Sequence, residues 1–482
     1  MVTNWLTCGG HPLTYNGKGI ALDSAFGPVP PFTLRIKFSE GYVPTMGTSQ
    51  RLVSQAQNIW DITNDRPDWS WLCNGRNEIL EVVDSNTTGV TNMKFLFFEC
   101  ENLSRINVLD TSAVTDMTRA FYECHSLVEI PEFDLRSATT LEYMFSGCPI
   151  SSAVLKNTSS VTNFVATFAG TNITEIPNFD ASSGEWFHNT FQGCTSLVSA
   201  VMPPTPRATH FRMTFSNCTS LVSVTLPDTH NVITTEFMFN NCRALVTAPA
   251  FDTQNVTNMA HMFVDCQSLT TVPLYSTSNV TNMHGMFSQC YSLQTIPTLD
   301  TSSVTDIGAM FSYCSSLVRI PTLDTSSVTN MSDMFGWAES LVEVPLLNTS
   351  NVTNMFGMLA GTTSLRTVPL FDTSRVTDMT QMFYASGVTS LPTFDLSSIT
   401  NMTRFCYHSA LVTVPLLDLS NVPVLVSAFE YCRKVETGAL SLYQSASTYG
   451  FPPEKVWWCF RETGIDTVSG RAELAQIPSD WK

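Results

Sequence analysis

The chain has 482 residues, of which 43% are hydrophobic and 13% charged, and its formal net charge is −17. Nucleic-acid binding needs clustered Lys and Arg, so this acidic balance excludes a nucleic-acid partner. No run approaches the roughly 18 to 20 apolar residues of a membrane-spanning helix, which excludes membrane insertion.

Residues 1–85 begin without the basic start, apolar stretch and small-residue cleavage site of a secretory signal. We therefore expect that a leader is missing from this numbering, or that the protein leaves its cell by assembly into a particle or by lysis. The segment PFTLRIKFSEGY predicts a strand that buries the alternating residues Leu34, Ile36 and Phe38. Residues 1–85 are interpreted as an N-terminal cap, with an attachment module as the alternative. Three tryptophans offer aromatic area to cover the end of a core: Trp60, Trp69 and Trp71.

Residues 86–435 repeat with a period of 22 to 24 residues, marked by a recurrent Met-Phe pair. Units this small cannot bury an apolar face alone, so stacked copies must share one core. Leu359 occupies the Phe position in one repeat. In the other repeats we expect the rings to form a continuous ladder of Phe97, Phe121, Phe145, Phe168, Phe191, Phe215, Phe239, Phe263, Phe287, Phe311, Phe335, Phe383, Phe405 and Phe429.

One repeat shows what each part contributes. Leu293, Ile296 and Leu299 predict an extended segment with inward apolar residues. The sequence Asp-Thr-Ser from residue 300 predicts a turn, because short polar side chains hydrogen-bond the local backbone. Ile307, which lies three and four residues before Met310 and Phe311, completes the spacing of one face of a short helix. We therefore expect a right-handed solenoid of α/β coils.

The phrases FDTQNVTNMAHMFVDCQSLTTVP and LDTSSVTDIGAMFSYCSSLVRIP resemble the Met-Phe-x-x-Cys variant of the BspA-like leucine-rich repeats of bacterial surface proteins. The resemblance covers most of the chain and implies a leucine-rich-repeat-like solenoid of about fifteen repeats. Members of that family resemble adhesins and host-interaction proteins. The repeated letters are scaffold, so the resemblance transfers no binding residue.

Residues 436–482 leave the period and are interpreted as a C-terminal cap. Leu440 to Tyr449 predicts a helix that Pro452 and Pro453 end, and Trp457 and Trp458 offer a second aromatic plug. The ending SGRAELAQIPSDWK and the head segment around KFSEGYVP resemble segments that flank such arrays in proteins of gut Bacteroidales and their bacteriophages.

Fourteen cysteines invite a disulfide or metal hypothesis, but no C-x-x-C pair or Cys-His zinc spacing occurs. Thr171, Ala338, Thr362, Ser386 and His408 replace Cys in five repeats, which indicates a position for small side chains. We interpret the column as reduced, structural thiols, with oxidation between coils as the alternative. Ten cysteines lie three residues after the repeat Phe: Cys100, Cys124, Cys148, Cys194, Cys218, Cys242, Cys266, Cys290, Cys314 and Cys432.

A second column is acidic, and calcium binding between coils is its alternative to turn chemistry. Ser276 and Asn348 break the column, which favours the turn. Its members are Asp110, Asp134, Asp180, Asp252, Asp300, Asp324, Asp372, Asp395 and Asp418. Five histidines lack a common phase and are interpreted as solvated surface residues: His188, His210, His230, His261 and His284. No nucleophile, phosphate-loop or dinucleotide motif occurs, so we expect no enzyme, cofactor or resident metal.

Large aromatics interrupt otherwise small or polar positions, and such residues bind sugars and form protein hot spots. Packing filler is the alternative interpretation. The candidates are Tyr313, Trp337, Trp186, Tyr275, Tyr291 and Phe356. Tyr313 and Trp337 occupy the same position in consecutive repeats, so we expect their rings to stack.

These observations favour a non-enzymatic binding protein, preferably a bacteriophage virion component of the fibre or receptor-binding type. The alternative is a bacterial cell-surface or secreted adhesin. The partners expected are a host-surface protein or glycan and other virion proteins, and the repeat is compatible with a homo-oligomer.

Overall fold

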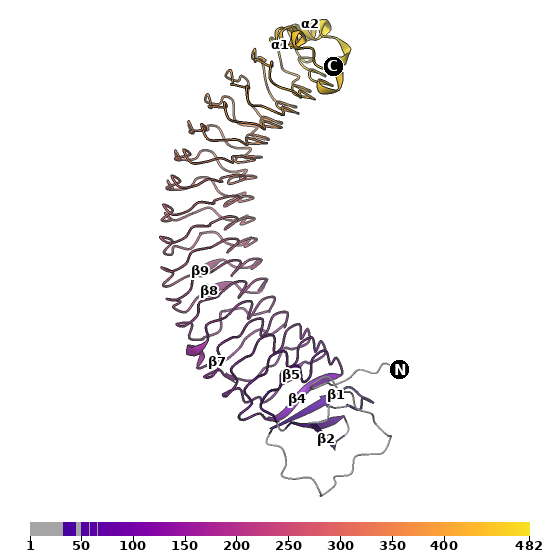
Figure 1. Ribbon diagram of the computed structural model, residues 1–482, viewed down its shortest axis with the longest axis vertical. Helices are drawn as coiled ribbons and strands as arrows, with labels where there is room; N and C mark the ends of the chain where they lie inside the picture. Colours follow the sequence, from indigo (N-terminus) through magenta and orange to yellow (C-terminus); the bar gives the residue numbers. More distant parts are fainter. Residues whose placement is uncertain (1–31, 45–49, 57, 65) are drawn as a thin grey trace. The chain divides into compact units, whose positions relative to one another are not determined.

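The computed structural model describes residues 32–44, 50–56, 58–64 and 66–482. It divides into two compact units, Met1–Val232 (unit 1) and Ile233–Lys482 (unit 2). Within each unit, successive repeats form coils that stack in chain order (Figure 1). The predicted solenoid is thereby confirmed as an architecture, while its right-handed sense and the count of fifteen repeats stay predictions.

Unit 1 begins with a five-stranded sheet of order β2-β3-β1-β4-β5. Strand β1 pairs antiparallel with β3 and β4, β2 pairs antiparallel with β3, and β4 pairs parallel with β5. The sheet therefore continues directly from the non-repeat segment into the coils. The strands are β1 (Phe32–Phe38), β2 (Gln50–Ala56), β3 (Ile59–Asn64), β4 (Ile79–Asn86) and β5 (Arg105–Ile106).

The predicted strand with one buried face is confirmed as β1, in which Leu34, Ile36 and Phe38 are buried. Trp69 is also buried, whereas Trp71 is 48% exposed. Trp71 therefore does not cover the core as expected.

Along the coils, hydrogen bonding between neighbours replaces long strands. The remaining regular elements of unit 1 are β6 (Phe133–Asp134), β7 (Leu155–Lys156), the 3-10 turn η1 (Thr158–Ser160), β8 (Ser199–Val201) and β9 (Ser223–Thr225). Strands β6 and β7 pair parallel, as do β8 and β9. Elsewhere single parallel bridges join equivalent residues of successive coils, for example Asn282 with Asp306 and Asp306 with Asn330.

The short helix predicted around Met310 and Phe311 is wrong, because the segment is a string of tight turns. The Met310 N–H donates to the Ile307 carbonyl at 3.2 Å, which closes a four-residue turn. Ala309, inside that turn, has a φ of 53°, which an α-helix does not allow. The N–H groups of the residues in between point along the stack toward the next coil. The Phe311 N–H, for example, donates to the Met334 carbonyl of the next coil at 2.9 Å. Donors that bridge coils cannot also close helical bonds, so stacking overrides the helical spacing.

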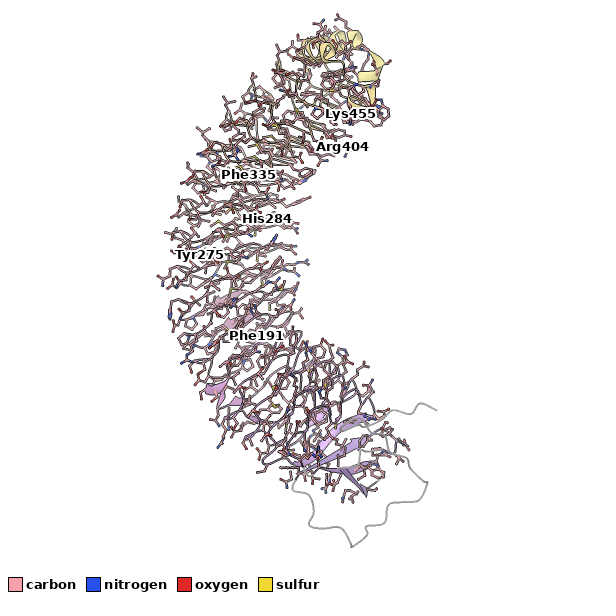
Figure 2. The ribbon with its side chains drawn as sticks, viewed as in Figure 1. Phe191, Tyr275, His284, Phe335, Arg404 and Lys455 are labelled. Atoms are coloured by element: carbon pink, nitrogen blue, oxygen red, sulfur yellow. The ribbon has the colours of Figure 1, made fainter. Side chains whose placement is uncertain are left out.

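The predicted aromatic ladder is confirmed. Phe287 is fully buried and its ring stacks on Phe263 and Phe311, with centroids 5.8 and 6.0 Å apart. The extended-segment residues Leu293, Ile296 and Leu299 are likewise buried. These columns form the core that neighbouring coils share. Figure 2 shows Phe335 between the two edges of the unit 2 coils, with Tyr275 toward one edge and His284 toward the other.

One repeat is shifted by a residue relative to the sequence alignment. The backbone N–H of a ladder residue normally donates to the carbonyl of the residue just before the next ladder residue. The Phe383 N–H donates to the Phe405 carbonyl at 2.8 Å. Cys406 therefore holds the ladder position, and Ser409 rather than His408 holds the position of the cysteine column. Phe405 contacts Phe383 edge-on instead of stacking on it, with centroids 5.3 Å apart and planes at 87°.

Coils extend beyond residues 86–435 at both ends. Before the array, the Cys73 backbone N–H donates to the Leu96 carbonyl at 2.9 Å, as a ladder residue does. After the array, the Phe429 N–H donates to Cys459 at 2.8 Å, and the Phe460 ring stacks on Phe429 at 5.7 Å. The two segments interpreted as caps therefore each contribute a coil.

The helical elements lie at the C-terminal end of unit 2 (Figure 1). The predicted helix is confirmed as α1, but the plug expected from Trp457 and Trp458 is wrong, since both are about half exposed. Phe460 and Trp481 are buried there instead, with stacked rings 6.1 Å apart. The elements are α1 (Ala439–Ala446), η2 (Ser447–Tyr449), η3 (Pro453–Lys455), α2 (Val468–Gln476) and η4 (Ser479–Trp481). Among the described residues, no helix has the length and apolarity needed to cross a membrane.

Candidate functional site

The string of turns in each coil leaves one exposed surface, which we call the turn face. Its key position lies two residues after the ladder residue, where the backbone is left-handed. Some coils place there residues that favour this conformation or tolerate it, such as Gly193, Asn217 and Asp265, and others place there ordinary residues such as Glu123 and Gln289.

Three coils of unit 2 instead place large aromatics at this position. Tyr313, Trp337 and Tyr431 have φ values of 60°, 62° and 60°. Left-handed backbone costs an ordinary L-residue roughly 1–2 kcal/mol, and such strain concentrates at functional positions. Glu99, Glu123 and Ala385 hold the same position with the same backbone, so the left-handed φ belongs to the repeat and the large rings are what distinguish these three coils.

The rings form a continuous aromatic row, defined here as Tyr313, Trp337, Tyr384, Tyr407, Tyr431 and Trp458. Tyr313 stacks on Trp337, with centroids 6.1 Å apart and planes at 12°. Trp337 reaches Tyr384 at 6.3 Å, and Tyr384 stacks on Tyr407 at 5.1 Å with planes 2° apart. Tyr407 meets Tyr431 edge-on at 5.4 Å.

The coil between Trp337 and Tyr384 carries Gly361 at the left-handed position. A Cβ on Gly361 would lie 2.6 Å from two ring atoms of Trp337. The glycine therefore lets the indole lie flat across this coil and reach Tyr384 two coils away. Ring and glycine together keep the row continuous.

Arginines lie against the C-terminal half of the row. The Arg404 guanidinium is 5.7 Å from the centre of the Tyr407 ring. Arg461 lies 5.7 Å from Tyr431 and 5.4 Å from Trp458, so it joins these two rings. Arg461 is anchored by the buried carboxylate of Glu430 at 3.5 Å. The row thus combines flat rings with positive charge in a chain whose net charge is −17.

The six aromatic residues predicted as candidates divide into three groups. Tyr313 and Trp337 stack as expected, with 44% and 36% of their surfaces exposed. Tyr275 is only 3% exposed and its hydroxyl donates to the Pro249 carbonyl at 2.9 Å, so its placement on an exposed face was wrong. It is a packing residue. The remaining three are Trp186 and Tyr291, which are exposed, and Phe356, which is half-buried.

Four of the six residues of the aromatic row were not predicted as binding residues. Tyr384 lies one residue after its ladder Phe rather than two, and Tyr407 lies in the shifted repeat that Cys406 anchors. Tyr431 does occupy the position of Tyr313 and Trp337, so its spacing was an available signal. Trp458 was assigned to a buried plug, although it belongs to the exposed face.

Unit 1 carries an aromatic group of its own on turns of equivalent hydrogen bonding. Trp71 stacks on Phe95 with centroids 3.9 Å apart. The Arg119 guanidinium lies 5.6 Å from Phe95 and 4.9 Å from Tyr143. Arg119 Nε is buried and has no hydrogen-bond partner among the described residues. Further along, Trp186 stacks on His210 at 5.0 Å.

The cysteine column has a structural role. All thirteen described cysteines are buried and free. The Cys314 thiol donates to the Phe287 carbonyl of the preceding coil at 3.1 Å, and equivalent bonds recur along the column. Burial raises the pKa of Cys314 to about 12. The thiol therefore serves as a small donor between coils, and this free state agrees with the structural interpretation.

The aspartate column follows the predicted turn chemistry. Asp300 accepts hydrogen bonds from the Ser302 hydroxyl and backbone N–H at 2.7 and 3.1 Å, and these bonds lower its pKa. Next to it, buried Thr301 donates to the Asp324 carbonyl of the following coil at 2.7 Å. Within the described ranges, no three His, Cys, Asp or Glu side chains gather as a metal site.

Two pairs of histidines, expected to be separate solvated residues, are brought together one coil apart. His188 and His210 have ring centroids 5.0 Å apart, and His261 and His284 are 5.1 Å apart. His284 Nδ1 lies 3.1 Å from Asp306 Oδ1, and this hydrogen bond raises the pKa of His284. The two histidines of each pair are about one repeat apart in the sequence, and this spacing could have predicted that they are neighbours.

Comparison with known proteins finds similar solved structures among bacterial leucine-rich repeat proteins. The solved structures similar to it include a leucine-rich repeat protein of Eubacterium ventriosum, at 16% identity over 61% of this chain and 85% of that chain, with a TM-score of 0.38. A leucine rich cell surface protein of Faecalibacterium prausnitzii is 19% identical over 69% of this chain and 87% of that chain, with a TM-score of 0.37. No curated protein matches the chain.

Two family models match. The model of the BspA type leucine rich repeat region, in six copies, matches residues 136–246. The model described as a Mycoplasma protein of unknown function, DUF285, matches residues 73–154, 209–319 and 318–417, which together exceed half of the chain. The chain therefore belongs to the DUF285 family and carries BspA-type leucine-rich repeats.

Proposed function

We propose that the protein is a non-catalytic recognition protein of the bacterial cell surface or exterior, and that it binds its partner through the aromatic row. The observation that carries the proposal is the stacking of large rings across successive coils, Tyr313 on Trp337 and Tyr384 on Tyr407. Rigid rings supply much contact area at little entropic cost, which suits recognition.

The partner class we propose is a host-surface protein or glycan, as the sequence favoured. The aromatic row crosses several coils, and its Tyr313, Trp337 and Trp458 rings are exposed, so it offers an extended contact rather than an enclosed active site. Membership among BspA-type repeat proteins supports a surface location. The virion role preferred from the sequence has no comparison in its favour, so the adhesin alternative becomes the main proposal.

The location is tested by treating intact producing cells with protease and with an antibody raised against the full chain. Surface labelling, and loss of the chain on protease treatment, support the proposal. A chain that is protected until lysis, or that sediments only with phage particles, contradicts it.

The role of the row is tested with the double variant Tyr313→Asn, Trp337→Asn in the full chain. Asn tolerates left-handed backbone, so the fold should persist with an unchanged circular dichroism spectrum. Binding of the fluorescent protein to host cells should fall at least tenfold. Tyr291→Ala is the matched control, because Tyr291 is an exposed ring that has no ring contact with the row. Equal binding by the double variant and the control refutes the assignment.

A further inference from the structure

A pocket of about 350 Å³ opens beside Tyr431 on unit 2. It crosses several successive coils, from Thr363 to Arg433, and also includes Asp466. A volume of this size lies in the usual range for small-molecule sites. No feature of the proposed function yet uses this pocket.

The length of the repeats explains the hollow. In a full-length coil, two residues separate the cysteine-column position from the next buried aliphatic residue, as between Thr362 and Leu365. Two consecutive coils here have only one: Gly387 follows Ser386, and Ala410 follows Ser409, as Pro149 follows Cys148 and Asn172 follows Thr171 in unit 1. The corners of these coils are therefore cut back, while the full-length coils on both sides form walls.

The floor of the hollow is tightly built. The Arg366 guanidinium donates to the carbonyls of Thr363 and Gly387 at 2.7 and 3.1 Å. A Cβ on Gly387 would overlap the Thr363 carbonyl and this guanidinium. The short corner is therefore fixed in place by a hydrogen-bonded arginine and requires glycine.

A buried hydroxyl in the floor lacks a partner. Ser386 is 3% exposed, lines the pocket, and its Oγ has no hydrogen-bond partner among the described residues. A buried polar group left without a partner costs roughly 1–3 kcal/mol. A ligand hydroxyl in the pocket would remove that cost.

The walls supply both charges and an aromatic ring. Arg433 lies 3.8 Å from Asp466 and 3.5 Å from Glu462, farther than the 2.7–2.9 Å of a tight charge-assisted hydrogen bond. The guanidinium and the Asp466 carboxylate therefore keep donors and acceptors available to a ligand. Tyr431, at the end of the Tyr384–Tyr407 stack, forms the aromatic wall.

This lining selects among ligand classes. Protein hot spots are desolvated pockets for large apolar or aromatic anchors, but the aliphatic side chains here are only those of Ala385 and Ala410. Arg433 and Lys434 line the pocket beside the Asp466 carboxylate, so its charges are of both signs and do not select a strongly anionic ligand. An uncharged sugar matches the site, because its hydroxyls donate and accept and its C–H face stacks on an aromatic ring.

We propose that this pocket binds one uncharged pyranose unit of a glycan, with the sugar ring against Tyr431 and hydroxyls bonded to Ser386 and the Arg433–Asp466 pair. The proposal deepens the proposed recognition function and rests on it for the biological role of the sugar. It assigns the ligand class at the C-terminal end of the aromatic row.

The test uses the full chain with the methyl glycosides of four uncharged sugars (glucose, galactose, mannose and N-acetylglucosamine) and of glucuronate, measured by saturation-transfer NMR and calorimetry. At least one glycoside should bind with a Kd in the millimolar range. Tyr431→Asn should weaken that binding at least tenfold. Tyr291→Asn is the control, since Tyr291 is an exposed ring that neither belongs to the aromatic row nor lines the pocket.

A second variant separates loss of binding from loss of folding. Ser386→Ala removes the unpaired hydroxyl, so it should raise the thermal midpoint while it weakens glycoside binding. Binding of none of the four glycosides, binding only of glucuronate, or equal loss in both tyrosine variants overturns the proposal. If sugar binding fails while Tyr313 and Trp337 still govern cell binding, the proposed function stands without it.

Discussion

Replacing Ala309 by Gly should stabilise the fold, the reverse of the usual effect. Ala309 has a φ of 53° inside the string of turns. Left-handed backbone costs an L-residue roughly 1–2 kcal/mol, and glycine avoids that cost. Glycine loses roughly 0.5–1 kcal/mol more conformational entropy on folding than alanine does. The net gain expected for Ala309→Gly is therefore about 0–1.5 kcal/mol.

The same substitution at Ala338 provides the control. Ala338 is fully buried in the cysteine column of the next coil and is not among the positive-φ residues. Ala338→Gly should cost about 1.5 kcal/mol, from the lost methyl group and the entropy of glycine. Native-state hydrogen exchange of the coils around residues 305–340 measures both changes locally, since a repeat array need not unfold in one step. Equal destabilisation by the two variants would refute the left-handed assignment.

Three further predictions follow from the core and its titrating groups. Phe287→Ala should cost about 3–5 kcal/mol and lower hydrogen-exchange protection most in the adjacent coils; uniform loss along the chain would contradict nearest-neighbour stacking. Cys314 and Cys432, whose pKa values burial raises to about 12, should resist iodoacetamide at pH 8 until the protein is unfolded, and mass spectrometry of the unreduced protein should show no bridges in the column. His188 should titrate near pH 4, because burial and then the charges of His210 and Arg212 lower its pKa to about 4. The stability that follows from this shift is present above pH 6.5 and is lost as pH falls toward 4. His188→Asn should therefore reduce the loss of stability on the acid side of a plot of unfolding free energy against pH. An NMR titration midpoint of His188 near 6.5 would contradict this prediction.

Phe429 is the last ladder residue recognised in the sequence, but it is not an end position of the stack. Phe429 has a stacking partner on its far side in Phe460, 5.7 Å away. It is therefore an interior ladder residue. A suitable end variant is Phe460→Ala, whose far neighbour is Trp481 rather than another coil.

Much of the candidate site was readable from spacing. Tyr313 and Trp337 lie at one repeat position in consecutive coils, and a one-dimensional stack makes such residues neighbours. Tyr275 met the same compositional criterion but lies inward, because its hydroxyl reaches the Pro249 carbonyl of the preceding coil. Residue type alone does not distinguish an exposed tyrosine from a buried one, because a hydrogen bond from the hydroxyl offsets the cost of burying it.

The sequence by itself determined the repeat, the Phe ladder, the small-residue column and the Asp turns, because each depends on residues a fixed distance apart along the chain. Only the tertiary structure decided the backbone of the string of turns. The spacing of Ile307, Met310 and Phe311 suits a helix, but hydrogen bonds between coils compete for the same N–H groups and are repeated along the stack. The same competition places residue 313 in left-handed backbone and turns its ring toward Trp337. The coils of Ser386 and Ser409 are each one residue shorter at the corner. Stacking holds their buried cores in register with the neighbouring coils, so the shortened corners are set back and leave a pocket.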